Sequence, residues 1–564
     1  MIADLPPGLI LILGALAIPL LPAGVRRVYA LALPALALWH LLTLPAGVHG
    51  QVEMLGQTLV FVRVDTLATA FGIIFLIAAF ISVIYGWHEE EALQHASALV
   101  YSGAAVGAVF AGDLITLFIF WELTAIASVF LIWARRTERA YWAGMRYLVV
   151  QIGSGVILLA GVVLHYRATG SITFGHLGVV SPGTTLIFVA FGIKCAFPLL
   201  HNWLQDAYPE ATVFGTVVLS AFTTKLAVYA LARGYAGTEM LVWIGAVMTA
   251  FPIFYAVIEN DLRRVLAYSL NNQLGFMVVG IGIGTELAID GTVAHAFTHI
   301  LYKALLFMSM GAVLYRVGTV KGSELGGLYK SMPMTAGFCI VGAASISAFP
   351  LFSGFVSKSL ILTAVAGEGH WFVWLVLLFA SAGVFHHSGI KIPFFAFFAH
   401  DSGKRCAEAP ASMLIAMGIT AALCIGIGVW PAPLYAILPY PVDFVPYTTA
   451  HVVTQLQLLM FSALAFSVLM RTGLYPPEMR SVNLDSDWIY RRMCPAVLSW
   501  LRDVIRTVHG NALRRAQVRL QRFIATIYRH HGPQGALART WPAGSMVLWV
   551  AVLLCVSLIF YYVE

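Results

Sequence analysis

Residues 192–212 read GIKCAFPLLHNWLQDAYPEAT, and this stretch decides the fold of the chain. Lys194 lies among apolar residues, and Pro198 follows it four positions later. Because proline has no N–H, the helical hydrogen bond to the carbonyl of residue 194 is missing. Inside a membrane a broken helix is tolerated only where it is buried in protein or lines a wet cavity. A buried amine beside a free carbonyl therefore favours an ion site over a simple proline kink.

The composition is that of a membrane protein. Hydrophobic residues make up 60% of the 564, charged residues only 10%, and the mean hydropathy is +0.86. Soluble domains carry roughly 25% charged residues. A helix needs about 20 apolar residues to cross a bilayer, and about sixteen segments meet that length. The sequence therefore predicts an all-α polytopic membrane protein.

We expect the spans to follow one another with mostly short connections. The predicted spans lie near residues 8–22, 28–46, 65–85, 96–111, 114–133, 143–165, 184–200, 213–232, 240–258, 265–283, 292–315, 334–366 (interrupted), 371–398, 411–430, 453–470 and 543–562.

Arginine and lysine gather in the loops after odd-numbered spans, which predicts that those loops face the cytoplasm. Both termini are then expected outside, in a cell inner (plasma) membrane. The first span lacks a basic leader and a cleavage site, so we expect it to be retained. The net charge of +7 reflects this loop bias and contact with the lipid bilayer, and does not indicate nucleic-acid binding.

Two stretches depart from the pattern of short loops. Residues 51–64 alternate around a glycine, which predicts a small external hairpin. Residues 487–529 are rich in arginine and carry apolar residues at near-helical spacing, which predicts a long amphipathic helix along the cytoplasmic face before a final anchoring span. That helix is either a linker on the membrane surface or a brace against a neighbouring subunit.

The chain has eight lysines, and five of them lie inside apolar stretches. A cation near the centre of a bilayer costs about 2.5 to 3.5 kcal/mol on insertion scales, so such groups are functional candidates by default. Together they suggest a path for charge. These five are Lys194, Lys225, Lys303, Lys358 and Lys391.

Glu122 lies in the middle of a predicted span, where a carboxyl group stays ionised only beside a cation or water. It forms either a fixed packing pair with a lysine or a switchable pair within a proton route, and the sequence favours the second. Asp113, at the start of the same span, is predicted to be an interface residue. Lys225 has Thr223 and Thr224 beside it, so we expect it to reach water or a hydroxyl group.

His295, His299 and Lys303 are spaced four residues apart, which places them along one face of a helix over roughly 12 Å. Such a stripe can relay protons, because neutral imidazole both donates and accepts hydrogen bonds. The histidines of residues 386–387 and Lys391 extend the pattern more weakly. Since Lys391 lies near a predicted cytoplasmic end, it can alternatively snorkel to the surface.

A second interrupted helix is predicted in residues 345–362, SISAFPLFSGFVSKSLIL, where Pro350 and Gly354 weaken the hydrogen-bond ladder before Lys358. Two broken helices, each with a lysine, indicate two structurally similar halves. This hydropathy pattern is typical of an inverted repeat with its sites at the interface between the halves.

Several of these segments resemble the antiporter-like membrane subunits shared by Mrp-type sodium/proton antiporters and respiratory complex I. The resemblance covers roughly residues 50–430 and rests on five runs. They are DLITLFIFWELTAIASVFLI (113–132), KCAFPLLHNWLQDAYPEAT (194–212) followed by Lys225, ENDLRRVLAYSLNNQLGFM (259–277), AFTHILYKALLF (296–307) and FPLFSGFVSK (349–358).

The resemblance implies a core of about 14 spans with two inverted five-helix repeats and broken helices in the seventh and twelfth spans. Glu122 and Lys194 are then the fifth-span glutamate and seventh-span lysine, a pair that opens and closes as protons pass. Lys225 is the eighth-span neighbour, His299 and Lys303 form the central bridge, and Lys358 is the twelfth-span terminal lysine.

We expect the chain to be organised in six consecutive regions. They are N-terminal spans with the hairpin (1–95), a first inverted repeat (96–232), a second (233–400), C-terminal core spans (401–471), the lateral amphipathic helix (472–542) and a final anchor (543–564).

Two features of the sequence indicate different branches of the family. The lysines of the eighth and twelfth spans and the run HSGIKIPFFAFFAHDSGKR (387–405) look most like the D-type branch of Mrp antiporter subunits. A lateral helix with an extra span is instead typical of the terminal antiporter-like subunit of complex I and of the large A-type subunit of Mrp systems.

The leading hypothesis is a proton-conducting subunit of a multisubunit Na⁺/H⁺ antiporter, with Na⁺ or K⁺ exchanged for protons and small membrane subunits as partners. The alternatives are a proton-pumping subunit of a complex I-type NADH-quinone oxidoreductase and the membrane anchor of an inorganic-carbon uptake system. The six cysteines have no paired or metal-like spacing, and no dinucleotide-binding fingerprint occurs. We therefore expect no metal site, no cofactor and no catalytic residue in the chain itself.

Overall fold

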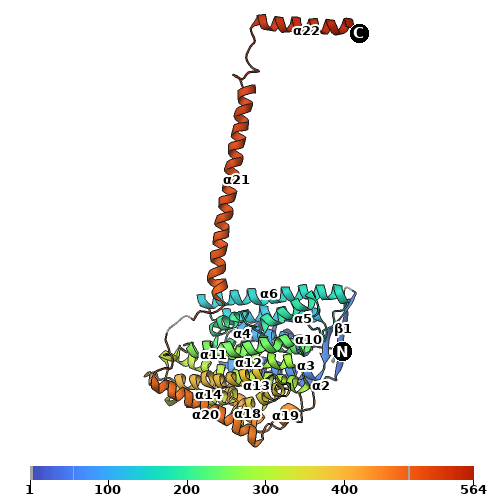
Figure 1. Ribbon diagram of the computed structural model, residues 1–564. Coiled ribbons are helices and arrows are strands. Elements are labelled where there is room, and N and C mark those ends of the chain that lie inside the picture. Colours follow the sequence, from blue (N-terminus) through green and yellow to red (C-terminus); the bar gives the residue numbers. More distant parts are fainter. Residues whose placement is uncertain (1–3, 55, 480–482, 564) are drawn as a thin grey trace. The chain divides into compact units, whose positions relative to one another are not determined.

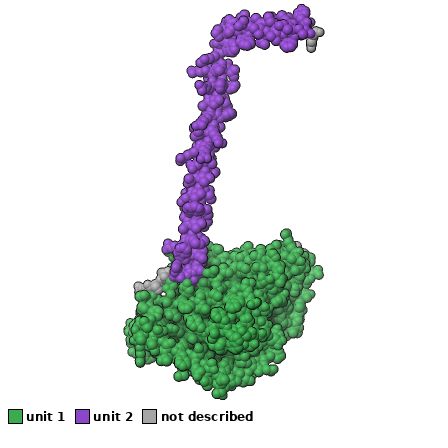
Figure 2. Space-filling view, viewed as in Figure 1, with its two compact units in different colours: residues 1–483 green, residues 484–564 purple. Residues whose placement is uncertain are grey.

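The computed structural model describes residues 4–54, 56–479 and 483–563 and contains two compact units, Met1–Asn483 and Leu484–Glu564 (Figure 2). Within the described residues, twelve helical segments are long and apolar enough to cross a membrane, judged by length and composition. Four shorter apolar helices accompany them. The prediction of an all-α polytopic membrane protein is confirmed.

The first unit begins with helices that flank a hairpin. The predicted hairpin is confirmed as two antiparallel strands, which pair Gly47 with Val64 and Met54 with Gln57. It lies at one end of the long helices (Figure 1). The elements are α1 (Pro7–Ala15), η1 (Ile18–Leu20), α2 (Ala23–Thr43), β1 (Gly47–Met54), β2 (Gln57–Val64), α3 (Thr66–Tyr85), η2 (Gly86–His88) and α4 (Ala92–Phe110).

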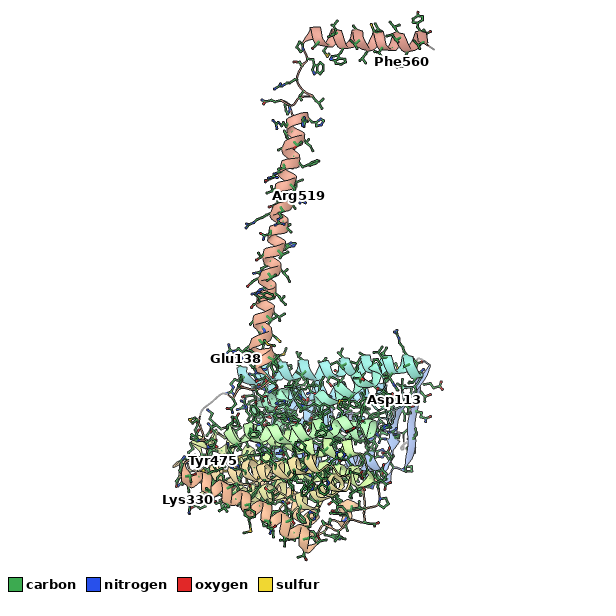
Figure 3. The ribbon with its side chains drawn as sticks, viewed as in Figure 1. Asp113, Glu138, Lys330, Tyr475, Arg519 and Phe560 are labelled. Carbon is green, nitrogen blue, oxygen red and sulfur yellow. The ribbon has the colours of Figure 1, made fainter. Side chains whose placement is uncertain are left out.

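The next two helices are α5 (Leu114–Trp133) and α6 (Glu138–Thr169). Asp113 caps α5 by accepting hydrogen bonds from the backbone N–H groups of Ile115 and Thr116. Its other carboxylate oxygen accepts from the N–H of Val60 in the hairpin at 2.7 Å. Asp113, which Figure 3 labels beside the hairpin, therefore fastens the hairpin to α5. Its expected place at the membrane interface stays a prediction.

The predicted break after Lys194 is present. Helix α7 (Pro182–Lys194) ends there, and α8 (Asn202–Ala207) and η3 (Tyr208–Glu210) resume after an irregular turn. Within that turn Ala196 and Leu199 adopt φ angles of 61° and 70°, a region that non-glycine residues rarely occupy. No backbone N–H of residues 195–200 donates to the Lys194 carbonyl. The proline thus leaves this carbonyl open, as the sequence predicts.

The second predicted break is also present and has the same backbone geometry. Helix α14 (Pro333–Ile346) ends before Ala348 and Leu351, whose φ angles are 55° and 73°, and α15 (Ser353–Gly367) follows. In both turns the positive angles fall on the alanine and the leucine of the tetrapeptide AFPL. The phenylalanine N–H bonds five residues back in each case. Sequence and backbone therefore repeat together.

The middle of the first unit is formed by long helices that run side by side (Figure 1). Helix α12 carries Asn271, Asn272 and Gln273 in its interior, so it is polar for a spanning helix, yet almost all its residues are buried. The elements here are α9 (Val213–Ala221), α10 (Thr223–Tyr235), α11 (Glu239–Ile258), α12 (Leu262–Ile283), α13 (Glu286–Val317), η4 (Gly322–Glu324) and η5 (Leu328–Lys330).

The predicted span at 371–398 changes its winding along its length. It begins as an α-helix, becomes π-helical, returns to α for one short turn and becomes π-helical again. The C-terminal elements of the first unit are α16 (Trp371–Val384), π-helical η6 (Phe385–Ile390), α17 (Lys391–Pro393), π-helical η7 (Phe394–Phe398), α18 (Ala411–Val429), α19 (Ala432–Tyr435) and α20 (Thr449–Thr472).

The second unit consists of π-helical η8 (Ile489–Met493), α21 (Cys494–His531) and α22 (Ala543–Val563). The predicted helices at 487–529 and 543–562 are therefore present. None of these helices buries a side chain within the described chain. The 38-residue α21 keeps its arginines and its apolar residues accessible together.

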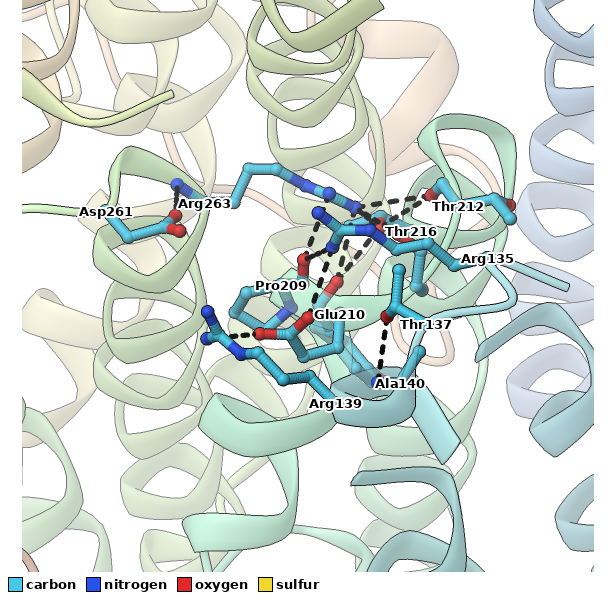
Figure 4. Close-up of polar contacts among 12 residues, drawn as sticks. Arg135, Thr137, Arg139, Ala140, Pro209, Glu210, Thr212, Thr216, Asp261 and Arg263 are labelled. Carbon is cyan, nitrogen blue, oxygen red and sulfur yellow. Dashed lines mark hydrogen bonds and ion pairs between the residues drawn. The ribbon is translucent and has the colours of Figure 1, made fainter. Parts of the chain in front are cut away.

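Arg263 falls between the predicted spans 240–258 and 265–283, yet only 1% of its surface is exposed. It lies in the first turn of α12, and its guanidinium group donates to the carbonyls of Pro209, Ala211 and Thr212 at 3.0–3.2 Å (Figure 4). Arg135 also donates to the carbonyl of Pro209, at 2.6 Å. These contacts hold the far end of the first broken helix against α12 and α5.

Replacing Arg263 with methionine should lower the free energy of unfolding by about 3 kcal/mol, because several buried carbonyls lose their donor. The thermal unfolding midpoint of the purified protein in detergent measures this. Arg167→Met is the matched control, since Arg167 is exposed on α6. Equal midpoints for the two variants would contradict the assigned role of Arg263.

Candidate functional site

The five lysines predicted to be buried are all at most 1% exposed. Each ammonium group donates to at least one backbone carbonyl, which replaces part of the hydration that burial removes. The acceptors are the carbonyls of Trp121 for Lys194, Ser220 for Lys225, Leu266 for Lys303, Ile346 for Lys358, and Ala256, Val257 and Glu259 for Lys391.

Lys194, at the broken end of α7, reaches across to α5. Its ammonium nitrogen lies 2.6 Å from the carbonyl oxygen of Trp121 and 2.7 Å from the hydroxyl of Thr124. It also lies 4.2 Å from the centroid of the Trp121 ring, which is a cation–π distance. The lysine is thus held by the helix turn that carries Glu122.

Glu122 and Lys194 nevertheless do not form an ion pair in the described structure. The Glu122 side chain turns toward α6, where a Cβ atom on Gly155 would overlap its carboxylate. Its Oε1 is buried and has no hydrogen-bond partner among the described residues. The two side chains predicted to pair therefore make no ion pair here, because α5 holds the lysine through Trp121 and Thr124.

Lys225 lies just after the interruption at Phe222 that divides α9 from α10. Its ammonium group donates to the carbonyl of Ser220 at 2.6 Å. Thr223 is bonded to Tyr101 instead, and the expectation that Lys225 reaches water or a hydroxyl group stays a prediction. The carbonyl beside the helix interruption is the acceptor that the described structure provides.

The predicted stripe of His295, His299 and Lys303 lies on one uninterrupted helix, α13, and all three side chains are buried. The imidazole centroids of the two histidines are 6.2 Å apart. His295 contacts Ser357 of α15 and Gln273 of α12 at 3.0 and 3.2 Å. Neither nitrogen of His299 has a hydrogen-bond partner among the described residues.

Lys358 belongs to the second broken helix and turns back toward its break. Its ammonium group donates to the carbonyl of Ile346 at 2.8 Å, the last residue of α14. The ring of Phe276 in α12 lies 5.1 Å away. Ser357, one residue earlier, contacts both His295 and Thr298 on α13. The second broken helix is therefore joined to the α13 stripe through a hydroxyl group.

Lys391 does not snorkel, so that alternative is wrong. Its side chain is fully buried, and its ammonium group lies 2.8 Å from the carboxylate of Glu478. It also donates to the carbonyls of Val257 and Glu259 at 2.6 and 2.7 Å. Glu478 follows the last helix of the first unit, and sequence reasoning counted it only as one acid in an arginine-rich tail.

Sequence reasoning also missed the small polar groups between the charged ones. Ser269 and Gln273 lie on α12, which offered a signal in its unusually polar run around Asn271 and Asn272. Ser388 lies in the π-helical turn and bonds to Ser269 at 2.8 Å. A single hydroxyl in a sequence gives no sign of what it faces.

The arrangement is suited to moving protons. Amines, imidazoles, a carboxyl group and hydroxyls line the interior of the first unit, and each can give or accept a proton without redox chemistry. In the described parts of the chain, no group of three His, Cys, Asp or Glu side chains is placed to hold a metal ion.

Comparison with known proteins identifies the domain. Residues 111–383 match the family described as NADH:quinone oxidoreductase/Mrp antiporter, TM. These residues belong to that family. The resemblance found in the sequence runs is thereby confirmed. We call the matched residues 111–383 the antiporter-like domain. It contains Glu122 and all the predicted site residues up to Lys358, whereas Lys391 lies beyond its end.

Two of the curated relatives carry different names. The chain is 32% identical to a D-type Na⁺/H⁺ antiporter subunit of Alkalihalophilus pseudofirmus, over 52% of this chain and 63% of the relative. It is also 32% identical to NADH-quinone oxidoreductase subunit N of Desulforudis audaxviator, over 52% of this chain and 62% of the relative. The matched part thus spans less than two thirds of each relative.

Two solved structures share the fold. A chain of the Mrp complex from Dietzia sp. DQ12-45-1b superposes with a TM-score of 0.70 at 21% identity, covering 83% of this chain and 99% of that one. A chain of the membrane-bound sulfane sulfur reductase, an archaeal respiratory membrane complex, gives 0.71 at 21% identity, covering 99% and 100%. The fold of the antiporter-like domain therefore occurs in both settings.

Gly155→Ala should destabilise the protein, because the added methyl group overlaps the Glu122 carboxylate. The overlapped atoms are the far end of a flexible side chain that can turn away, so we expect a loss of about 1 kcal/mol, the low end of the usual cost of overpacking. Gly153→Ala is a control on the same helix, since a Cβ there meets nothing within 4 Å. Alanine at that position should be neutral or stabilising, because it favours the helix by about 1 kcal/mol. Thermal unfolding in detergent measures both, and the reverse order would contradict the placement of Glu122.

Proposed function

We propose that this chain is the proton-conducting membrane subunit of a multisubunit monovalent cation/proton antiporter that exchanges Na⁺ or K⁺ for protons. The observation that carries the proposal is the buried row of titratable side chains in the first unit. It comprises Glu122, Lys194, Lys225, His295, His299, Lys303, Lys358 and Lys391.

The row is proposed to conduct protons because its side chains are held by hydrogen bonds that weaken when an amine or imidazole loses its proton. A protonated lysine makes a charge-assisted hydrogen bond to a free carbonyl, whereas the neutral amine binds the same carbonyl more weakly. Loss of the proton therefore lets the side chain move toward its neighbour. The two unpartnered nitrogens of His299 lie between Lys225 and Lys303 in the proposed order. Both can exchange a proton without breaking an existing hydrogen bond.

The pair of Glu122 and Lys194 is proposed as the switch. Lys194 is bound to the carbonyl of Trp121, one residue from Glu122, so a change of side-chain rotamer would bring the charges together. Pairing would stabilise the ammonium form, and separation would favour release of its proton. Opening and closing this pair therefore gates the row.

The two broken helices are proposed to belong to inverted repeats at residues 96–232 and 233–400. The shared AFPL turn, with positive φ angles at the same two positions, supports this division. Residues 1–95 and 401–471 then flank the repeats, and 472–542 and 543–564 form a lateral helix and an anchor. Transporters place their sites at such repeat interfaces.

The basic end of the first unit is proposed to face the cytoplasm, and both termini of the chain are proposed to lie outside, in a bacterial plasma membrane. Glu138 and Lys330 lie at the end of the helices opposite Asp113 (Figure 3), and Arg135, Arg139 and Arg263 belong to the same end (Figure 4). Positive residues mark the cytoplasmic side. Small membrane subunits are the proposed partners.

A redox-driven pump is the second candidate. It is favoured by the likeness to a respiratory complex, because that superposition covers 99% of this chain and therefore includes the long C-terminal helices. Mild-detergent purification with mass spectrometry separates the two. Iron–sulfur or flavin subunits would support the pump, and small membrane subunits alone would support the antiporter.

Lys194→Ala and Glu122→Ala should each abolish cation-driven proton movement in inverted membrane vesicles containing the assembled complex, because each removes one side of the switch. Lys321→Ala is the control, since that lysine lies on a loop and pairs with Glu324 at 3.6 Å. Immunoblotting of the membranes establishes equal insertion. Exchange at the control rate in either variant would overturn the proposed route.

A further inference from the structure

A row of hydrogen bonds connects Lys303 with residues that follow the antiporter-like domain in the sequence. The Lys303 ammonium group donates to the hydroxyl of Ser269 at 2.9 Å. Ser388 donates to the same hydroxyl at 2.8 Å, and a ring nitrogen of His387 lies 2.8 Å from Ser388. Three buried side chains therefore connect the central lysine to η6, beyond the matched residues 111–383.

The receiving end of this row has π-helical winding. His387 and Ser388 both lie in η6, and π-helical turns are rare and frequently mark functional sites. The other ring nitrogen of His387 is buried and has no hydrogen-bond partner among the described residues. Such a group needs a functional explanation, because nearly all buried polar atoms in proteins are satisfied.

One turn farther along this segment, Lys391 meets Glu478. The carboxylate is only 5% exposed, and its Oε2 has no hydrogen-bond partner among the described residues. Its neighbourhood also contains Glu259, whose carboxylate accepts from Asn483 at 3.3 Å and lies 3.9 Å from Arg264. The segment that follows α20 thus supplies a second carboxyl–lysine pair.

Aromatic rings cover this pair on one side. Phe395, Phe466 and Tyr475 form a small buried cluster, and the ring of His386 lies 5.3 Å from Phe466 and 5.4 Å from Tyr475. Tyr475 lies at the same end of the helices as Lys330 (Figure 3). The cluster therefore lies beside the ion pair, at the basic end of the first unit.

We propose that Glu478, Lys391, His387, Ser388 and Ser269 form a branch of the proton route that connects Lys303 with the basic, cytoplasmic end, with Glu478 as its outermost proton carrier. This inference rests on the proposed function. We call this set of five residues the Glu478 branch.

The transfer is a sequence of proton hops in which no electrons change hands. Protonated Glu478 gives its proton to the neutral amine of Lys391, which passes one to the free ring nitrogen of His387. The proton on the opposite ring nitrogen then moves to Ser388, whose own proton passes through Ser269 to neutral Lys303. Lys391 follows His387 by four positions on the same helical segment, and its flexible side chain is proposed to carry the proton across this step.

A purely structural ion pair fits the observations less well. A buried pair contributes little net stability unless its remaining lone pairs are hydrogen-bonded, and Oε2 of Glu478 is not. Burial also raises the pKa of Glu478, against the opposing charge of Lys391, so the carboxyl group can hold a proton more readily than an exposed one.

The test uses inverted membrane vesicles containing the assembled complex, in which the initial rate of cation-driven proton movement is measured. Glu478→Gln and Ser388→Ala should each lower that rate about tenfold or more, the usual scale for loss of a proton-transfer group. Glu478→Asp keeps an ionisable carboxyl group and should retain most of the rate, which a packing role for the longer side chain would not allow.

The matched controls are Glu324→Gln and Ser309→Ala. Glu324, the last residue of η4, pairs with Lys321. Ser309 donates to a carbonyl of its own helix and to the sulfur of Met417. Both should keep the wild-type rate. Immunoblotting must find each variant in the membrane at the wild-type amount, and Ser269→Ala serves as a second break in the row if Ser388→Ala fails to accumulate.

The outcomes separate this branch from the function as a whole. Wild-type rates in Glu478→Gln, Ser388→Ala and Ser269→Ala, together with loss of activity in Lys194→Ala, would overturn the branch and leave the proposed function standing. A wild-type rate in Lys194→Ala would instead overturn the route from which the branch departs. Equal loss in Glu478→Gln and Glu478→Asp would assign Glu478 a packing role and also overturn the proposal.

Discussion

The rest of the structure depends on how an ammonium group is held inside an apolar bundle. An isolated buried ion loses its hydration, which costs several kcal/mol even after the protein relaxes. Continuous helices offer few free acceptors, because their carbonyls are bonded within the helix. Helix breaks and helix ends free some of these carbonyls, and Lys225, Lys358 and Lys391 donate to carbonyls at such points. The helix interruptions therefore provide the acceptors that allow these lysines to be buried.

This constraint connects the local geometry to the proposed motion. A carbonyl holds the protonated amine more strongly than the neutral one, because the hydrogen bond to the ammonium is charge-assisted, so the position of each lysine depends on its charge. The separation of Lys194 from Glu122 is one such arrangement, in which the turn after Trp121 holds the amine. The rigid parts, such as the Arg263 contacts to the end of the first broken helix, keep the acceptors in place while side chains move.

Much of the fold could be predicted because its signals are long or local. The length of the apolar segments predicted the membrane spans, and Pro198 predicted the first helix break. The sequence was less informative where the deciding contact is distant. Snorkelling stayed open for Lys391 because no nearby residue indicates the contact with Glu478. The burial of Arg263 could not be foreseen because its acceptors lie some fifty positions earlier. The repeated AFPL turn was visible in the sequence, but its shared backbone angles were not.

The central claim is that the buried side chains form one connected proton route, and Lys303 is its most direct test. This lysine lies between the α13 histidines and the Ser269 hydroxyl, where the proposed branches meet. The measurement is the rate of cation-driven proton movement in vesicles carrying Lys303→Met, compared with Lys330→Met, whose lysine is exposed and pairs with Asp401. The account predicts that the first variant assembles but moves no protons while the second is unaffected. A wild-type rate in assembled Lys303→Met would contradict it.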